Sequence, residues 1–307
     1  MISTDTSANV INGTPPPHDG LGERAGKPQG LTWRDPRAAA LAWLAAYLAI
    51  AGVMLLVHGS WGLATLHVVL IAVIFVARAP GNVIGDFLPL VVAPALYGEI
   101  PALIAAAGTT YHDALVQRWE LALFGTQPSH TLASWLPNIA LSELLHAGYL
   151  SYYAVLFVPA LLLYARRRRG SFAATVLTLT LTCTICWGIF VAMPVEGPRY
   201  LFSAPPNIPD GPLRRLAVSL LAAGSSRGAA FPSSHMAVSV AMAVTALRWQ
   251  RRTGWVVLAA AILIGFGAVY GGFHYGVDMI AGAALGLTTS LIVIATFNTA
   301  RWESTGE

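Results

Sequence analysis

The stretch Arg227-Gly-Ala-Ala-Phe-Pro-Ser-Ser-His235 lies where a polar loop meets a new apolar run. Pro232 suits the first turn of a helix, because the amide hydrogen that proline lacks has no partner at a helix start. Ser233 and Ser234 are residue types preferred as N-caps. A helix that begins here directs free N–H groups outward and favours a bound anion. The stretch therefore predicts either an anion site flanked by Arg227 and His235, or a capped membrane helix with a histidine near its start.

A second stretch, Tyr270-Gly-Gly-Phe-His-Tyr-Gly-Val-Asp278, contains another histidine and a carboxylate. His274 and Asp278 are four residues apart, so on a helix they share one face. A carboxylate that binds one imidazole nitrogen fixes the tautomer and leaves the other nitrogen free to attack. The alternative is a buried His–Asp hydrogen bond that only ties helices together. A third stretch, Glu196-Gly-Pro-Arg-Tyr200, places Arg199 at the end of a different apolar run.

Together the three stretches resemble the type 2 phosphatidic acid phosphatase superfamily. Pro232-Ser-Ser-His235 matches the Pro-Ser-Gly-His element of that family, with serine in place of glycine. His274 and Asp278 match the end of a later element, and Arg199 corresponds to the arginine of an earlier one. The segment Leu123-Phe-Gly-Thr-Gln-Pro-Ser129 is similar to the branch that contains inositol phosphorylceramide synthases and many bacterial lipid phosphatases. The resemblance extends over residues 80–298.

The sequence departs from the family pattern at its other basic positions. Ala192 stands where the family has a lysine, and Gly267 and Ala268 stand where it has Ser-Arg. A site for a multiply charged phosphate therefore lacks a cation. We predict that Arg227 compensates, because a guanidinium binds two phosphoryl oxygens at once.

The composition indicates a membrane protein. Hydrophobic residues make up 56% of the 307 residues and charged residues only 10%, whereas a soluble domain has about 25% charged residues. The formal charge of +4 comes from arginines in short loops between apolar runs, so we expect no nucleic-acid partner. Cys183 and Cys186 lie within one apolar run and indicate packing positions, not a disulfide framework.

The expected fold is an all-α polytopic helix bundle with about eight transmembrane helices, since about 20 apolar residues span a bilayer. Two accessory helices in 38–77 precede a six-helix catalytic core in 78–300. The polar segments 1–37 and 301–307 predict cytoplasmic tails, the first of them disordered. The apolar runs lie near 38–57, 61–77, 83–107, 139–164, 172–193, 234–250, 255–271 and 276–298.

Two segments of the core have less regular patterns. The run 83–107 contains acidic residues and prolines, so it predicts a kinked or re-entrant element. The segment 108–138 mixes aromatic and charged residues and predicts an amphipathic element in the membrane interface. That element is either a lid over a lipid entrance or a plain interfacial anchor.

The distribution of basic residues predicts the orientation. Eight spans place 13 of the 18 basic residues on one side, which is therefore cytoplasmic. Arg199, His235 and His274 all fall on the opposite, non-cytoplasmic side. We expect an integral membrane protein of the inner membrane, if it is bacterial, with its site facing away from the cytoplasm.

Other polar residues within the apolar runs are weaker candidates. Glu143 and His146 have a spacing that binds metals in helical bundles, but one such motif lacks the number of ligands a metal requires. We interpret them as structural or headgroup-facing, together with Tyr200 and Tyr270. Because positive charge comes from the protein, we expect no metal and no other cofactor.

The resemblance implies a mechanism. His274 attacks the phosphorus of a lipid phosphate, Asp278 orients His274, and His235 acts as acid and then as base. Arg199, with Arg227 as our own addition, and the amides around Ser233 and Ser234 hold the phosphoryl oxygens.

Three functions remain open on this basis. The first is an integral-membrane lipid phosphatase that forms a phospho-histidine. The second is a lipid phosphotransferase that uses an alcohol, such as inositol or a sugar, in place of water. The third is a transporter or scaffold that binds anionic lipid without chemistry. The cluster lies at span ends and not at mid-membrane, which favours an enzyme over a transporter. The sequence leaves the lipid, the acceptor and the oligomeric state undetermined.

Overall fold

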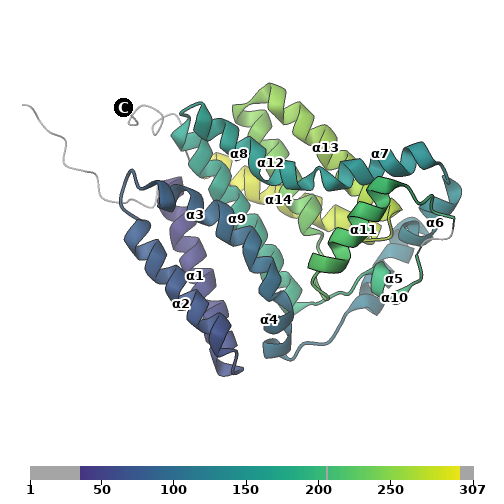
Figure 1. The fold of residues 1–307 in the computed structure, drawn as a ribbon, viewed down its shortest axis with the longest axis horizontal. Helices are drawn as coiled ribbons and strands as arrows, with labels where there is room; N and C mark the ends of the chain where they lie inside the picture. Colours follow the sequence, from purple (N-terminus) through teal and green to yellow (C-terminus); the bar gives the residue numbers. More distant parts are fainter. Residues whose placement is uncertain (1–34, 205–206, 298–307) are drawn as a thin grey trace, which may run out of the picture. The chain divides into compact units, whose positions relative to one another are not determined.

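The computed structural model describes residues 35–204 and 207–297, which form helices α1 to α14 and the short 3₁₀ helix η1 (Figure 1). Within these two ranges, the β-pairing consists of one isolated parallel bridge between Val195 and Ala229. The expected all-α class is therefore confirmed. Most of the predicted N-terminal tail and all of the predicted C-terminal tail lie outside the described residues.

The helices have the following bounds: α1 Pro36–Val57, α2 Trp61–Ala77, α3 Val83–Ala95, η1 Leu96–Glu99, α4 Ile100–Ala107, α5 Asp113–Phe124, α6 Pro128–Trp135, α7 Ile139–Leu150, α8 Tyr152–Ala165, α9 Arg169–Ala192, α10 Pro198–Leu201, α11 Pro212–Gly224, α12 Ser234–Trp249, α13 Arg251–Tyr270 and α14 Gly276–Thr296.

All eight apolar runs form helices, but fewer of them meet the length and composition of a membrane span. Among the described residues, five helices or continuous segments are long and apolar enough to cross a membrane. A sixth is counted if α7 and α8, which are bent by 43° relative to each other, form one span. Helix α2 has 17 residues and α12 has 16, so each is shorter than the expected 20. The run 83–107 is one of the five, interrupted by η1.

Helix α12 lies at the centre of the core and packs against α8, α9, α13 and α14. Its contact with α14 depends on small residues. A side chain at Gly282 would collide with the Ser233 carbonyl oxygen, and one at Gly286 would collide with the Ala237 carbonyl oxygen. This confirms the expectation that the small-residue stretch at 281–286 allows close helix contact. Gly282 thereby brings α14 against the beginning of α12.

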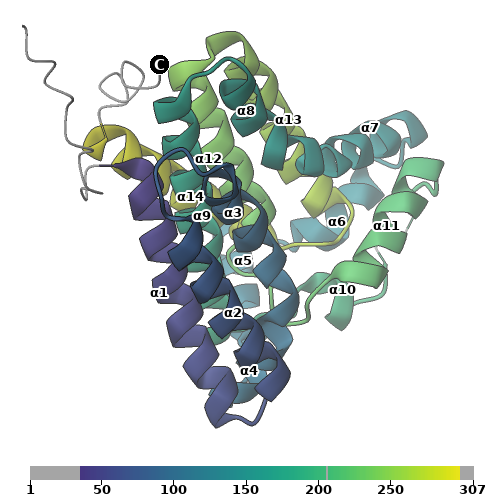
Figure 2. The ribbon, with the colours of Figure 1, turned by 60° about the vertical axis from the view of Figure 1, so that its left-hand side comes forward.

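Helices α1 and α2 pack together and contact the core through α3, α4 and α9, on the side away from α6, α7 and α11 (Figures 1 and 2). A buried polar cluster joins the two parts. The Tyr47 hydroxyl donates to Glu99 Oε1 (3.0 Å), and His67 Nε2 lies 3.1 Å from Glu99 Oε2. Glu99 had no identifiable partner in the sequence, and the structure supplies two.

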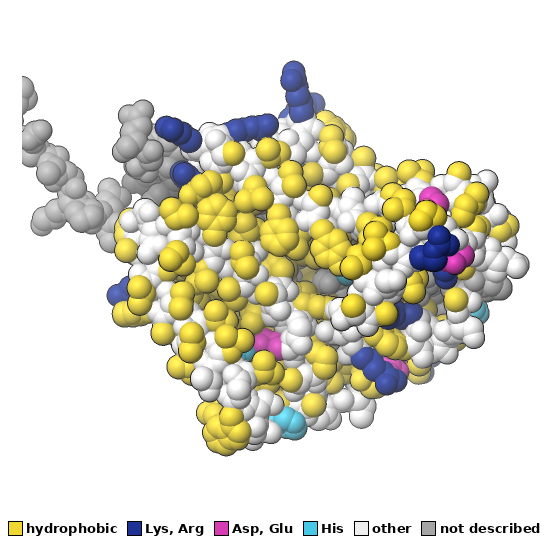
Figure 3. All heavy atoms as spheres, in the orientation of Figure 1, with side chains coloured by type: hydrophobic (Ala, Val, Ile, Leu, Met, Phe, Trp, Pro, Cys, Tyr) yellow, Lys and Arg dark blue, Asp and Glu magenta, His cyan; other side chains and the backbone are white. Residues whose placement is uncertain are grey.

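Arginine-rich loops meet at the C-terminal end of α12. Arg166 Nη1 donates to Gln250 Oε1 (3.0 Å), and Arg168 Nη1 donates to the Trp249 carbonyl (2.6 Å). The surface in Figure 3 is largely hydrophobic, with basic side chains along its upper edge. His235 lies at the opposite end of α12, and 16 residues at about 1.5 Å each separate the two ends by about 24 Å.

Candidate active site

Main-chain hydrogen bonds hold the three motif stretches together. The Val195 amide donates to the Gly228 carbonyl (3.1 Å), and the Ala230 amide donates to the Val195 carbonyl (2.9 Å). The Ser233 amide donates to the Asp278 carbonyl (3.0 Å). These bonds join the loops before α10, α12 and α14, so the convergence of the motifs at one end of the bundle is a property of the backbone.

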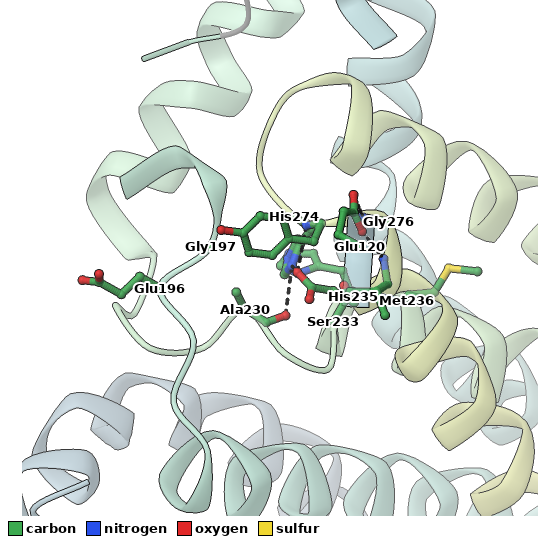
Figure 4. Close-up of polar contacts among 12 residues, drawn as sticks. Glu120, Glu196, Gly197, Ala230, Ser233, His235, Met236, His274 and Gly276 are labelled. Atoms are coloured by element: carbon green, nitrogen blue, oxygen red, sulfur yellow. Dashed lines mark hydrogen bonds and ion pairs between the residues drawn. The ribbon is translucent and has the colours of Figure 1, made fainter. Parts of the chain in front are cut away.

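The imidazole of His274 has one nitrogen fixed and one available. Nδ1 lies 3.1 Å from the Ala230 carbonyl oxygen and 3.3 Å from Asp278 Oδ2 (Figure 4). Both partners accept hydrogen bonds, so Nδ1 carries the proton and Nε2 keeps its lone pair. Burial, reinforced by the charge of Arg199, lowers the pKa of His274 to about 4 against an opposing effect of the Ala230 carbonyl. The ring therefore stays neutral at physiological pH, as a nucleophile requires.

His274 and Asp278 do not share a helix, although their side chains are in contact. Helix α14 begins at Gly276, and the extended Tyr275 is its N-cap (φ −70°, ψ 154°). His274 lies in the turn before it, and Asp278 lies in the first helical turn. Oδ2 of Asp278 also accepts from the Tyr275 amide (2.9 Å), so one carboxylate caps the helix and orients the histidine.

His235 lies in the first turn of α12 and faces His274. The two ring centroids are 5.9 Å apart. The ring of His235 stacks on Tyr149 at 5.1 Å, and the Tyr149 hydroxyl is 3.3 Å from Nε2. Nδ1 is buried and has no hydrogen-bond partner among the described residues. Two approaches of about 3 Å each would fit a phosphoryl group between the rings, so Nδ1 of His235 and Nε2 of His274 are the nitrogens available to it.

Arg199 supplies the positive charge beside the two histidines. It shares with His235 and His274 a small cavity of about 20 Å³, of which Tyr200 forms an exposed part of the rim. Nη2 makes a long contact to the Leu221 carbonyl (3.4 Å), and the buried Nη1 has no partner in the described chain. An unpaired buried guanidinium donor next to a nucleophile is suited to a phosphoryl oxygen.

The structure separates Arg227 from the histidine pair. Its Nε forms an ion pair with Glu196 Oε1, and its side chain is 59% exposed. Figure 4 shows Glu196 pointing away from His235 and His274. Arg227 is not among the residues around the small cavity. Its expected contact with phosphate therefore requires a rearrangement of this ion pair and stays a prediction.

The two serines at the start of α12 have different positions. Ser233 is the N-cap: its hydroxyl accepts from the Met236 amide (3.3 Å), and its own amide is bonded to Asp278. The Ser233 amide is therefore engaged within the protein, and the expected contact of Ser233 with phosphate stays a prediction. The amides of Ser234 and His235, in the first turn, have no intrahelical partner and remain as anion donors.

The expected headgroup residues on α7 and α13 are engaged within the protein. Glu143 accepts from the amides of Leu213 (2.9 Å) and Arg214 (3.2 Å) at the start of α11. Tyr270 is fully buried, and its hydroxyl donates to the Leu136 carbonyl (2.9 Å). His146, also buried, binds the Ser142 carbonyl through Nδ1 (2.6 Å). Within the described ranges, no group of three or more metal-ligating side chains occurs.

Two acids on α5 position the site, and the sequence analysis missed them. Asp113 accepts from the amides of Glu196 and Gly197, each at 2.9 Å, and so fixes the loop that leads to Arg199. Glu120 accepts from the amides of Gly276 (2.9 Å) and Val277 (2.8 Å), two residues after His274. In the sequence these acids indicated an amphipathic interfacial segment. The structure turns them inward, and no local sequence pattern separates them from solvated acids.

The departure from the family pattern at Ala268 has a structural basis. Ala268 is fully buried in the same cluster as Ala217 of α11. Its carbonyl accepts from the amides of Phe273 (2.9 Å) and His274 (3.3 Å). Position 268 thus contributes to the site through its main chain.

A larger apolar cavity of about 450 Å³ reaches His235 from the side of the bundle. Its walls come from α3, η1, α8, α9 and α11, and it contains His235 but not His274. Side chains that line it include Val91, Tyr97, Tyr152, Phe157, Trp187 and Leu220. The cavity is therefore suited to an apolar chain attached to a group that His235 protonates.

Fold and site together define a polytopic all-α membrane protein with a paired-histidine, arginine-containing centre. The sequence model of the PAP2 superfamily matches residues 114–292, more than half of the chain, and the chain belongs to this superfamily of phosphatases. It is also similar to the "Bacitracin transport permease protein BcrC" of Bacillus licheniformis, with 33% identity over 66 residues. That match covers 22% of this chain and 32%, about a third, of the relative. No solved structure matches the chain.

Proposed function

We propose that this protein is a lipid phosphatase that acts through a phospho-histidine. The observation that carries the proposal is the state of His274. Its Nδ1 is held by two acceptors, which leaves Nε2 available, and its ring lies next to that of His235 in a cavity that Arg199, with an unpaired donor, also lines. This arrangement combines a nucleophile, an acid–base group and an oxyanion donor in one small cavity.

The proposed reaction has two steps that use the same two histidines. In the first, Nε2 of His274 forms a bond to phosphorus, the bond from phosphorus to the lipid oxygen breaks, and His235 gives its proton to that oxygen. In the second, water attacks phosphorus, His235 takes a proton from the water, and the P–N bond breaks to release phosphate. Asp278 orients His274 and stabilises the positive charge on its ring in the intermediate.

The apolar cavity supports a lipid as the leaving group. It opens at His235, the residue that protonates the leaving oxygen, and its walls are mainly aliphatic and aromatic side chains. A substrate with an apolar chain can therefore lie in this cavity while its phosphoryl group lies between the two rings. The positive charge at the phosphoryl group comes from Arg199 and from the amides of Ser234 and His235, so we propose catalysis that is independent of metal ions.

We further propose that the site faces away from the cytoplasm. The arginine-rich loops at 166–169 and 248–252 lie at the C-terminal end of α12, and the histidine pair lies near its N-terminal end. The positive-inside rule assigns the arginine-rich end to the cytoplasm. Labelling from outside intact cells is expected to modify Asn207→Cys and not Thr253→Cys, whereas the opposite pattern would reverse the assignment.

The proposal is tested by incubating purified protein with lipid phosphates whose phosphorus is radiolabelled. Wild-type protein is expected to release phosphate and, after rapid acid-free quenching, to carry label on histidine. His274→Ala is expected to do neither. Binding of the lipid without release or labelling in the wild type would favour the transporter or scaffold alternative. Labelled product that appears only when an alcohol is supplied would favour the phosphotransferase.

A further inference from the structure

A second cavity, of about 240 Å³, adjoins the small cavity that holds the histidine pair. The two cavities share Arg199, Leu221 and Phe273. Neither His235 nor His274 lines the second cavity, and Arg199 is the charged residue that the two have in common.

Three buried donors around this cavity have no partner in the described part of the chain. They are the Ser129 hydroxyl, Arg199 Nη1 and Arg214 Nε. Ser129 is only 2% exposed. Arg199 Nη1 is the donor assigned above to the catalytic phosphoryl group. The Ser129 hydroxyl and Arg214 Nε indicate a further ligand that supplies the missing acceptors, because buried polar groups are rarely left without a partner.

The local charges favour an anion as this ligand. The Arg214 side chain is 16% exposed, and its Nη1 donates to Asp210 Oδ1 (2.7 Å). Asp210 also lies 3.6 Å from Arg215 Nη1. Glu143, the other carboxylate at the start of α11, is bonded to main-chain amides. Arg199 and Arg214 therefore bring more positive charge to the cavity than these acids neutralise.

We propose that the cavity formed by Ser129, Arg199 and Arg214 is a second phosphoryl-anion site. The inference rests on the proposed function, because it assigns this cavity to the part of the substrate that stays on phosphorus when the lipid leaves. A simple phosphate monoester has no such part. The cavity instead fits a lipid phosphodiester whose retained headgroup carries a phosphate, in which case the second step releases the headgroup as its phosphate ester and not inorganic phosphate, or it takes free inorganic phosphate. Its volume, below the roughly 300 Å³ of common small-molecule pockets, suits a group of that size.

Arg214 is accordingly a binding residue. Arg215 is the matched control, because it lies next in sequence on α11, contacts the same Asp210 and is 61% exposed. Arg214→Gln and Arg215→Gln remove the same charge from the same helix. Only the first removes a donor from the cavity.

The binding test uses inorganic phosphate and the full-length protein in detergent, by calorimetric titration. Wild type is expected to bind two phosphates per chain, and Arg214→Gln is expected to weaken one of them by about ten- to hundredfold. Arg215→Gln is expected to keep both sites. Ser129→Ala removes a neutral donor and is expected to weaken the same site by a smaller factor. A single site in wild type, or equal behaviour of Arg214→Gln and Arg215→Gln, would overturn the proposal.

A kinetic test separates the two sources of the anion. It compares a lipid phosphodiester whose headgroup carries a phosphate with the same diester whose headgroup is neutral. If the site takes a retained headgroup, Arg214→Gln lowers the ratio of the two kcat/KM values by about tenfold or more, and Arg215→Gln leaves it unchanged. If the site takes free phosphate, the ratio is unchanged and inhibition by added phosphate weakens. Phosphate binding is measured without turnover, so a chain that hydrolyses no lipid phosphate can still confirm or refute the second site.

Discussion

Removal of the Glu120 carboxylate tests whether α5 positions the nucleophile. Glu120 is fully buried and accepts two main-chain hydrogen bonds, from Gly276 at 2.9 Å and Val277 at 2.8 Å. Glu120→Ala leaves two buried amides without a partner, at on the order of 1 to 3 kcal/mol each, so we expect a loss of about 2 to 5 kcal/mol of stability. Glu120→Gln keeps one acceptor oxygen but presents an NH₂ group to the second amide, and we expect about half that loss.

Activity is expected to fall more than stability alone explains, because these amides directly follow the His274 turn. The assay is phosphate release from a lipid phosphate at a temperature where both variants remain folded, together with unfolding in detergent followed by circular dichroism. Arg118→Gln, an exposed charge on the same helix, is the control and is expected to change neither quantity. If Glu120→Ala matches Arg118→Gln in both assays, α5 does not position the site.

The remaining predictions concern the histidines and the contact between α12 and α14. His235→Ala is expected to slow turnover by about 100- to 10,000-fold and to accumulate label on His274 when the leaving group is good; rapid-quench labelling checks this, and unlabelled His235→Ala protein would contradict its assigned role. Gly282→Ala is expected to push α14 away from Ser233 and to lower kcat, whereas Gly62→Ala, which has open space around it, is expected to have no effect; equal kcat values would exclude the close contact. The pKa of His274 is lowered to about 4 in the folded protein, so its imidazole binds protons more strongly in the unfolded chain. The neutral ring therefore contributes stability above about pH 6.5, and this contribution is lost as the pH falls towards 4. Phosphoryl transfer to His274 is likewise expected to persist at pH 5.5, measured as single-turnover labelling, and a loss of labelling centred near pH 6.5 would refute the pKa shift.

The part of the site that the sequence predicted depends on short-range pattern. Residue type and spacing indicate the chemistry of the motifs that contain His235, Arg199 and the pair His274–Asp278. The structure brings these residues together. Apolar run length likewise predicted the helices. The apolar run at 276–298 agrees with the start of α14 at Gly276, but the sequence could not show that Asp278 caps this helix, because that bond depends on the conformation of Tyr275.

Long-range contacts were the part that pattern could not predict. Glu120 lies 156 residues from the amide of Gly276 to which it bonds, and Asp113 lies 83 residues from that of Glu196. Nothing in the local sequence distinguishes these carboxylates from solvated ones. Arg227 shows the converse: its position in the motif indicated a phosphate contact, but Glu196 provides a nearer partner. Such pairings follow from tertiary packing, which the periodicity of apolar residues and the composition of a segment do not encode.

The burial of Ala268 against the cluster that contains Ala217 limits the routes by which this chain could change. An arginine at position 268 would match the family pattern, but Ala268 is fully buried, so the longer side chain would need volume that other core side chains fill, and overpacking of this kind displaces backbone. Phe273 and His274 both donate to the Ala268 carbonyl, so a displaced backbone at 268 would move the turn that carries the nucleophile. The small side chain at 268 and the present position of His274 are therefore mutually dependent, and a single substitution cannot introduce the family residue without disturbing the site.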